Sequence, residues 1–268
     1  MILTTQKISD SYWKVIINNP PINLFGPEMS EELIVLIDEF EAAENLKVVV
    51  FESANPDFFI AHLDVLKATG FPKGAGKTGL SKSWPDIAKR FEQAPFVSIA
   101  SIRGRARGLG SEFAQAMDMR FASKEKAIFG QPEIGFSIFP GGGGMERLHL
   151  LTGKAKALEI ILGGDDFDAE TAAAYGWVNR AIADGELDAF VENLAQRIAS
   201  FDKKVIAEIK SIINARAVNP KNEQIMDTQT RFFEALAQPE AAIRMKNLFA
   251  KGLQQNSDAE LNLGKHLV

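Results

Sequence analysis

The amino-acid sequence predicts an α/β fold with a helical C-terminal region, and three observations lead to this prediction. Before Gly144, short apolar runs typical of buried strands alternate with stretches of helical spacing, which favours stacked βαβ-like units. After Gly144 the pattern is mainly helical. The length of 268 residues suits one large domain, or one domain with a smaller appendage. We therefore expect an α/β core over residues 1–200 and a helical region for oligomerisation over residues 201–268.

The first elements are predicted from local composition. Residues 12–18 are rich in aromatic and β-branched side chains and end before a proline pair, as a strand does. A helix is expected to begin at Pro27, because apolar residues then recur at helical spacing as far as Phe40. Residues 47–51 form a β-branched run typical of a strand buried on both faces.

The next stretch contains the longest predicted loop. Residues 58–60 continue the apolar pattern, and residues 61–68 are predicted to form a short helix. Residues 69–80 are rich in Gly, Lys and Pro, and we expect a mobile surface loop there. A Gly-Lys-Thr triplet inside it resembles the end of a phosphate-binding loop, but Phe71 stands where that motif needs its first glycine. A helix over residues 81–93 should follow.

A second buried strand is expected at residues 96–102. It leads into a glycine-bearing turn at residues 104–110 and a helix that runs to about Met117. Two further short strands are predicted at residues 119–122 and 127–129. The alternation of strand, turn and helix is therefore maintained up to this point.

The C-terminal part is predicted to be helical with one exception. Residues 177–182 have the composition of a short strand. From Leu187 onward the helix pattern is nearly continuous, with breaks expected at Asn219-Pro220 and at Gln238-Pro239.

Composition and charge exclude several classes of function. The net charge is −5 without any run of like charges, which argues against nucleic acid as the main ligand. The absence of cysteine excludes disulfides, thiolate catalysis and Cys-ligated metals. No apolar run approaches the ~18 residues of a membrane-spanning helix, and the first residues do not resemble a secretory signal. We expect a cytoplasmic protein without a membrane anchor.

Common catalytic motifs are missing as well. There is no Gly-x-Ser-x-Gly nucleophile elbow, and the three histidines, at positions 62, 149 and 266, lack the paired spacing of metal ligands. We therefore expect no bound metal. Carboxylates and backbone amides remain as candidate catalytic groups, and two glutamates stand out among them. Glu112 lies at the start of the helix that follows a buried strand, and Glu133 lies among apolar residues and turn formers.

Four motifs around these glutamates resemble the enoyl-CoA hydratase/isomerase (crotonase) family. Their order and spacing match the family over about residues 10–200. They are FIAHLD at residues 59–64, GLGSEF at residues 108–113, FGQPE at residues 129–133 and FPGGGGMERL at residues 139–148. The resemblance implies a crotonase-type spiral of ββα units with a C-terminal helical region that helps trimers, or dimers of trimers, to form. Apolar residues at 232–233, 236 and 248–249 are expected to supply faces for this assembly.

The resemblance also implies roles for individual residues. The backbone amides of Ala61 and Leu109 would form an oxyanion hole for a thioester carbonyl, and Glu112 and Glu133 would be the catalytic carboxylates. Ala61, Leu109 and the segment His62-Leu63-Asp64 would contact the substrate, an acyl-CoA thioester. No separate cofactor is implied, because coenzyme A is carried by the substrate. The chain departs from the family at His62 and Leu109, where glycine is usual, and both side chains add bulk beside the thioester site.

Several functions remain open at this point. A 2-enoyl-CoA hydratase would use both Glu112 and Glu133. A double-bond isomerase would need a carboxylate at the position of Glu133 alone. Other activities of the same family are possible on this scaffold. The substitutions at His62 and Leu109 also allow a protein that binds CoA esters without turnover.

Overall fold

The computed structural model describes residues 1–71 and 83–267. In this part of the chain the strands form two sheets. The larger sheet has the order β1-β2-β3-β5-β7-β10, with β1 (Leu3–Ser9), β2 (Tyr12–Ile17), β3 (Val48–Ser53), β5 (Val97–Ile102), β7 (Met119–Ser123) and β10 (Arg180–Ile182). The smaller sheet has the order β4-β6-β8-β9, with β4 (Phe58–Ile60), β6 (Arg105–Arg107), β8 (Ile128–Gly130) and β9 (Phe167–Asp168). Only the pairs β1–β2 and β8–β9 are antiparallel.

The strands alternate between the two sheets along the chain. Each of β3, β5 and β7 in the larger sheet is followed by a short strand in the smaller sheet and then by a helix or 3-10 turn. The helical elements are η1 (Val65–Gly70), α1 (Pro27–Ala42), α2 (Trp84–Gln93), α3 (Leu109–Ala116), η2 (Pro132–Phe136), α4 (Gly144–Thr152), α5 (Lys154–Gly163), α6 (Ala169–Tyr175), α7 (Asp184–Ala199), α8 (Lys203–Arg216), α9 (Asn222–Leu236), α10 (Pro239–Ala250), α11 (Asp258–Leu261) and α12 (Leu263–His266). This repeated ββα arrangement is the spiral expected from the sequence.

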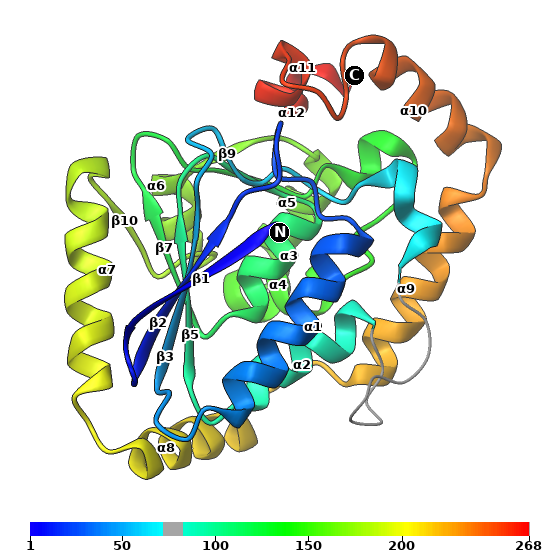
Figure 1. Cartoon of the computed structure of the whole chain (residues 1–268). Helices are drawn as coiled ribbons and strands as arrows, with labels where there is room; N and C mark the ends of the chain where they lie inside the picture. Colours follow the sequence, from blue (N-terminus) through cyan, green and yellow to red (C-terminus); the bar gives the residue numbers. More distant parts are fainter. Residues whose placement is uncertain (72–82, 268) are drawn as a thin grey trace.

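The larger sheet separates two apolar cores. Helix α7 covers one face of it, and α1 to α4 lie on the other (Figure 1). On the side of α1 to α4, Phe113 packs edge-on against Phe51 with ring centroids 5.3 Å apart and stacks on Trp84 at 5.6 Å. Aromatic pairs of this kind contribute about 0.5–1.5 kcal/mol beyond their buried area. Phe113 therefore anchors the short helix that carries Glu112.

Three local predictions need correction. Residues 105–107 lie inside the predicted turn but form β6, because they pair with β4 on one side and β8 on the other. Residues 61–64 are not helical, since the amide of Phe25 donates to the carbonyl of His62 and the amide of Asp64 donates to the carbonyl of Phe25. Strands β1 and β9 were not expected. Each owes its place to a partner strand rather than to a strong local signal.

The C-terminal helices break where the sequence predicts. Helix α8 ends at Arg216, α9 begins at Asn222, and α10 begins at Pro239. The apolar residues expected to face another subunit pack largely within the chain, since Phe232 and Leu248 are buried in a cluster with Phe136. The loop predicted over residues 69–80 lies outside the described residues from position 72 onward. No helix within the described ranges is long and apolar enough to span a bilayer.

Candidate active site

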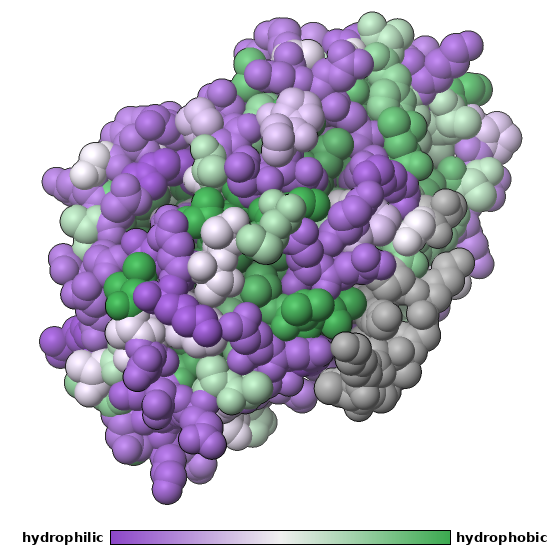
Figure 2. Space-filling view, viewed as in Figure 1, coloured by the Kyte–Doolittle hydropathy of each residue, from purple (hydrophilic) through white to green (hydrophobic). Residues whose placement is uncertain are grey.

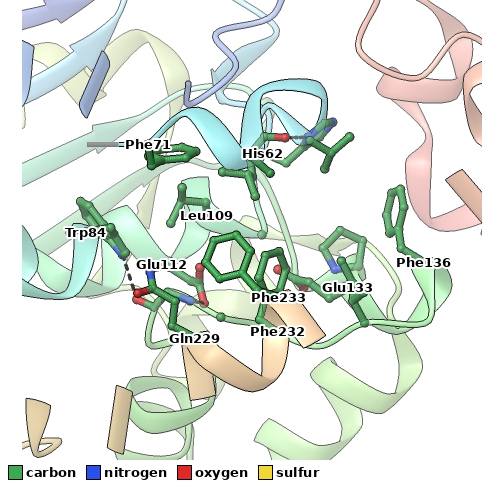
Figure 3. Close-up of a pocket in the computed structure, with 18 of the residues that line it drawn as sticks. His62, Phe71, Trp84, Leu109, Glu112, Glu133, Phe136, Gln229, Phe232 and Phe233 are labelled. Atoms are coloured by element: carbon green, nitrogen blue, oxygen red, sulfur yellow. Dashed lines mark hydrogen bonds between the residues drawn. The ribbon is translucent and has the colours of Figure 1, made fainter. Parts of the chain in front are cut away.

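A cavity of about 450 Å³ lies where the N-terminus of α3 meets the segments around β4 and η2 and the helix α9 (Figure 3). Its walls are mostly apolar, with two carboxylates among them. The lining residues include His62, Leu63, Phe71, Trp84, Gly108, Leu109, Glu112, Glu133, Phe136, Ile138, Gly142, Gln229, Phe232 and Phe233. An apolar pocket with a few convergent polar groups is the usual form of a small-molecule site.

The turn before α3 brings backbone amides to this cavity. Gly108 has a φ of 48°, a conformation that favours glycine, and its amide donates to the carbonyl of Gly130 at 3.0 Å. Leu109 is the first residue of α3, so its N–H has no partner within the helix. Within residues 1–71 and 83–267 it has no other acceptor either. This amide is therefore free to bind an oxygen that enters the cavity.

Glu112 is held in a fixed position on the cavity wall. Its Oε1 accepts hydrogen bonds from the amides of Gly142 and Gly144, both at 2.8 Å. Its Oε2 lies on the same side of Gly142 as the apolar side chains of Leu109 and Trp84. Burial raises the pKa of Glu112 to about 7, although the two amide hydrogen bonds oppose the shift.

Glu133 lies on η2, directly after β8, and lines the same cavity. Its Oε1 lies 3.4 Å from the side-chain amide nitrogen of Gln131, and a contact with its own backbone amide slightly favours the ionised form. Burial, followed by the negative charge of Glu112, raises the pKa of Glu133 well above its ordinary value. Two carboxyl groups thus share one cavity, and the more strongly hydrogen-bonded Glu112 is the one that ionises more readily.

The segment at residues 61–64 contributes to the cavity through His62 and Leu63. Ala61 is buried and packs with Ile22 and Phe58 in a separate cluster, away from the residues that line the cavity. The N–H of Leu63 has no acceptor in the described part of the chain, whereas the neighbouring backbone groups pair with Phe25. The geometry therefore favours Leu63 over Ala61 as the partner of the Leu109 amide.

The two remaining predicted contact residues point elsewhere. The ring of His62 is directed away from the two glutamates (Figure 3), with Nδ1 2.7 Å from the carbonyl of Leu63 and Nε2 2.9 Å from Glu260. Asp64 accepts a hydrogen bond from the side chain of Gln254 at 2.9 Å and does not line the cavity. His62 therefore lines the cavity without its ring filling it, whereas the side chain of Leu109 faces the cavity.

Sequence reasoning missed several lining residues. Gln229, Phe232 and Phe233 reach the cavity from α9, whose apolar pattern predicts only a surface for assembly (Figure 3). Gly142 was part of a recognised motif without a role, and its carbonyl also accepts from the indole of Trp84 at 2.8 Å. An amphipathic pattern shows which face of a helix is apolar but not which element that face meets.

A family model and several known proteins are similar to this chain. Residues 7–255 match the family model described as enoyl-CoA hydratase/isomerase. The short-chain-enoyl-CoA hydratase of Clostridium acetobutylicum is 31% identical over 203 residues, covering 75% of this chain and 76% of that one. The crystal structure of a "putative enoyl-CoA hydratase" from Streptomyces avermitilis is 38% identical, covers 99% of this chain and 96% of that one, and superposes with a TM-score of 0.91.

A longer protein is similar as well. The fatty acid oxidation complex subunit alpha of Aliivibrio fischeri is 31% identical over 173 residues, which cover 63% of this chain. The match spans only 25% of that protein's length.

Proposed function

The chain belongs to the enoyl-CoA hydratase/isomerase family, and we propose that it is a hydratase that adds water across the 2,3 double bond of an enoyl-CoA thioester. One observation supports the hydratase above the other activities of the family. Two buried carboxyls, Glu112 and Glu133, line one cavity and differ in how easily they ionise. Addition of water needs a base and an acid at the same time, and a pair with separated pKa values can supply both.

Polarisation of the thioester is the first role that we assign. The amides of Leu63 and Leu109 would donate to the thioester carbonyl oxygen, since both line the cavity without another acceptor in the described ranges. Negative charge develops on this oxygen when the enolate forms, and preformed amide donors stabilise it without reorganisation. In this role Leu63 replaces Ala61.

Proton transfer is the second role. Ionised Glu112 would accept a proton from water through its free Oε2, while the remaining hydroxide bonds to C3 of the enoyl group. Protonated Glu133 would then give its proton to C2, which completes the addition. The turnover leaves Glu112 protonated and Glu133 ionised, so one proton must pass between them through solvent before the next cycle. No cofactor enters these steps, because coenzyme A stays bound to the acyl group.

The direct test uses the purified protein and crotonyl-CoA without added cofactor. Hydration removes the conjugated double bond, so the absorbance of the enoyl thioester should fall and 3-hydroxybutyryl-CoA should accumulate. Unchanged absorbance, together with measurable binding of crotonyl-CoA, would instead support a CoA-ester binding protein.

A double-bond isomerase is the second candidate, and the surroundings of Glu112 favour it. The side chains of Leu109 and Trp84 reach the same space beside Gly142 as the free Oε2, where a hydratase must hold its water. An isomerase needs no water and moves one proton with the carboxylate of Glu133. Conversion of a 3-enoyl-CoA to the conjugated 2-enoyl-CoA, with no hydration of crotonyl-CoA, would establish this alternative.

The two carboxyls should give a bell-shaped pH dependence of kcat/KM. Glu112 must be ionised, so activity should rise as the pH increases through about 7. Glu133 must be protonated, so activity should fall at higher pH, where this carboxyl ionises. The two limbs belong to the coupled pair and should be measured from about pH 4 to pH 10. An acid limb at the ordinary pKa of glutamate, about 4.3, would contradict a buried catalytic base.

We also propose that the chain assembles as a trimer or as a dimer of trimers. The surface in Figure 2 is largely hydrophilic, with apolar residues in small separate patches. On α8, however, Val205, Ile209 and Ile213 are each more than half exposed and recur every four residues, so they form an apolar stripe. Light scattering at micromolar concentration should give the mass of three or six chains. A stable monomer would count against assembly.

A further inference from the structure

His62 stands where the family usually has glycine, and each of its ring nitrogens faces an acceptor. Nδ1 lies 2.7 Å from the carbonyl oxygen of Leu63, and Nε2 lies 2.9 Å from Oε1 of Glu260. A carbonyl can only accept, and a carboxylate that already accepts from the Gln254 amide does the same. Both nitrogens must therefore carry a proton, so the geometry describes an imidazolium cation.

The charges around the ring agree with this protonation state. Burial alone would lower the pKa of His62, but the charge and hydrogen bond of Glu260 and the carbonyl of Leu63 together raise it above its ordinary value. Burial would likewise raise the pKa of Glu260, but His62, the Gln254 amide and Arg107 hold it below its ordinary value. The result is a buried ion pair between residues 198 positions apart.

Glu260 lies on the short helix α11, and this helix is also bound to strand β6 next to the site. Arg107 is buried on β6, directly before the turn that carries Leu109, and its Nη1 donates to the carbonyl of Glu260 at 2.6 Å. Its other nitrogens make a two-point contact with Asp166, at 2.6 and 2.7 Å. Helix α11 thus contacts both segments that present a free amide to the cavity.

Hydrogen bonds hold the Leu63 peptide on both sides. The carbonyl of His62 accepts from Phe25, and the amide of Asp64 donates back to Phe25, both at 2.9 Å. The imidazolium holds the remaining carbonyl, that of Leu63 itself. These contacts leave the Leu63 N–H without an acceptor in the described part of the chain.

We propose that His62 is a positioning residue, which as an imidazolium clamped between the Leu63 carbonyl and Glu260 keeps the Leu63 amide directed at the thioester oxygen. Through Glu260, helix α11 then supports the oxyanion hole from outside the cavity, since none of its residues lines the cavity. This inference rests on the oxyanion role proposed above for Leu63.

Removal of either charge should weaken the polarisation of bound substrate. We expect His62→Gln and Glu260→Gln each to lower kcat by roughly tenfold or more, which is less than the 10²–10³-fold that loss of a whole oxyanion donor costs. KM should change little, because the lost interaction strengthens only as charge develops. The double variant should be no worse than either single one, since one substitution already breaks the pair.

A second readout separates this inference from the proposed function. The probe is 4-dimethylaminocinnamoyl-CoA, whose absorption moves to longer wavelength when its carbonyl is polarised. The wild type should show this shift whether or not it hydrates crotonyl-CoA, and His62→Gln and Glu260→Gln should show less of it. His266→Gln is the matched control, because the contact of His266 with Asp258 is a His–carboxylate pair at 3.0 Å in the same C-terminal segment but exposed.

If the variants do not fold, the pH dependence of the probe's absorption shift in folded protein tests the proposal instead. The groups near the pair are Arg107, Asp166, Asp64 and Glu133. The pKa of His62 is raised, so the clamp should be intact at neutral pH and lost as the pH rises through that raised value. In the Glu133→Gln protein, measured above pH 8 so that Glu112 with its pKa of about 7 is already ionised, the spectral shift should therefore diminish as the pH rises further. An absorption shift that stays constant up to alkaline pH would overturn the proposal. So would a loss of this shift in His266→Gln as large as the loss in His62→Gln.

Discussion

Replacement of Glu112 or Glu133 by glutamine is expected to lower kcat for enoyl-CoA hydration by roughly 10²–10⁴-fold, the usual contribution of general acid–base catalysis. The amide keeps the shape of the side chain but can neither take a proton from water nor give one to C2. In Glu112→Gln the side-chain oxygen can still accept from Gly142 and Gly144, so the loop should stay in place. Stopped-flow or steady-state absorbance with crotonyl-CoA measures the loss.

The fold should survive both substitutions. The raised pKa of Glu133 means that the folded protein favours its neutral form, so its contribution to stability decreases as the pH rises above the unfolded value of about 4.3. Glutamine cannot ionise, so the thermal midpoint of Glu133→Gln at pH 8 should equal or exceed that of the wild type. Glu186→Gln, at an exposed acid in the first turn of α7, is the control and should change neither rate nor stability.

The pattern across the two variants distinguishes the candidate reactions. A hydratase loses activity in both. An isomerase loses activity in Glu133→Gln and retains most of it in Glu112→Gln. If neither substitution affects the turnover of any enoyl-CoA, the catalytic assignment is wrong and a binding function gains support.

The sequence predicted the parts of the site that depend on short local patterns. Glu112 follows a buried strand and a glycine turn, and Glu133 lies in a five-residue motif, so both could be identified from the residues adjacent in sequence. The helix breaks before α9 and α10 could be predicted for the same reason, because proline acts locally. Each of these features is fixed within about ten residues of chain.

The parts that escaped prediction depend on contacts between distant segments. Strand β6 is three residues long and exists because two neighbouring strands pair with it. His62 looked like added bulk in the pocket, but its partner Glu260 is far away in the sequence and draws the ring outward. Leu63 rather than Ala61 lines the cavity because Phe25 sets the path of that segment. No pattern in a single sequence reports such pairings.

Gly110→Ala should be strongly disruptive. Gly110 is the second residue of α3, and a Cβ there would lie 2.1 Å from the carbonyl oxygen of Ile60 on β4. The oxygen belongs to the backbone of β4 and the position of the Cβ is set by the backbone of α3, so no side chain can move to relieve the overlap. The start of α3 must shift away from β4, and it carries the Leu109 amide with it. We expect a loss of at least about 2–3 kcal/mol in the free energy of unfolding, at the upper end for forced overpacking.

Activity should fall with stability, but for a separate reason. A displacement of about 1 Å at a catalytic group can cost on the order of 10²-fold in rate, so Gly110→Ala should be slow even at temperatures where it is folded. Gly185→Ala is the matched control, since Gly185 is the second residue of α7 and a Cβ there meets nothing within 4 Å. Alanine should raise stability there by up to about 1 kcal/mol, because it loses less backbone entropy in a helix than glycine. Chemical denaturation and crotonyl-CoA turnover of the two variants measure both effects. Equal behaviour would mean that α3 and β4 do not approach as closely as the structure has them, and that the Leu109 amide is not held against β4.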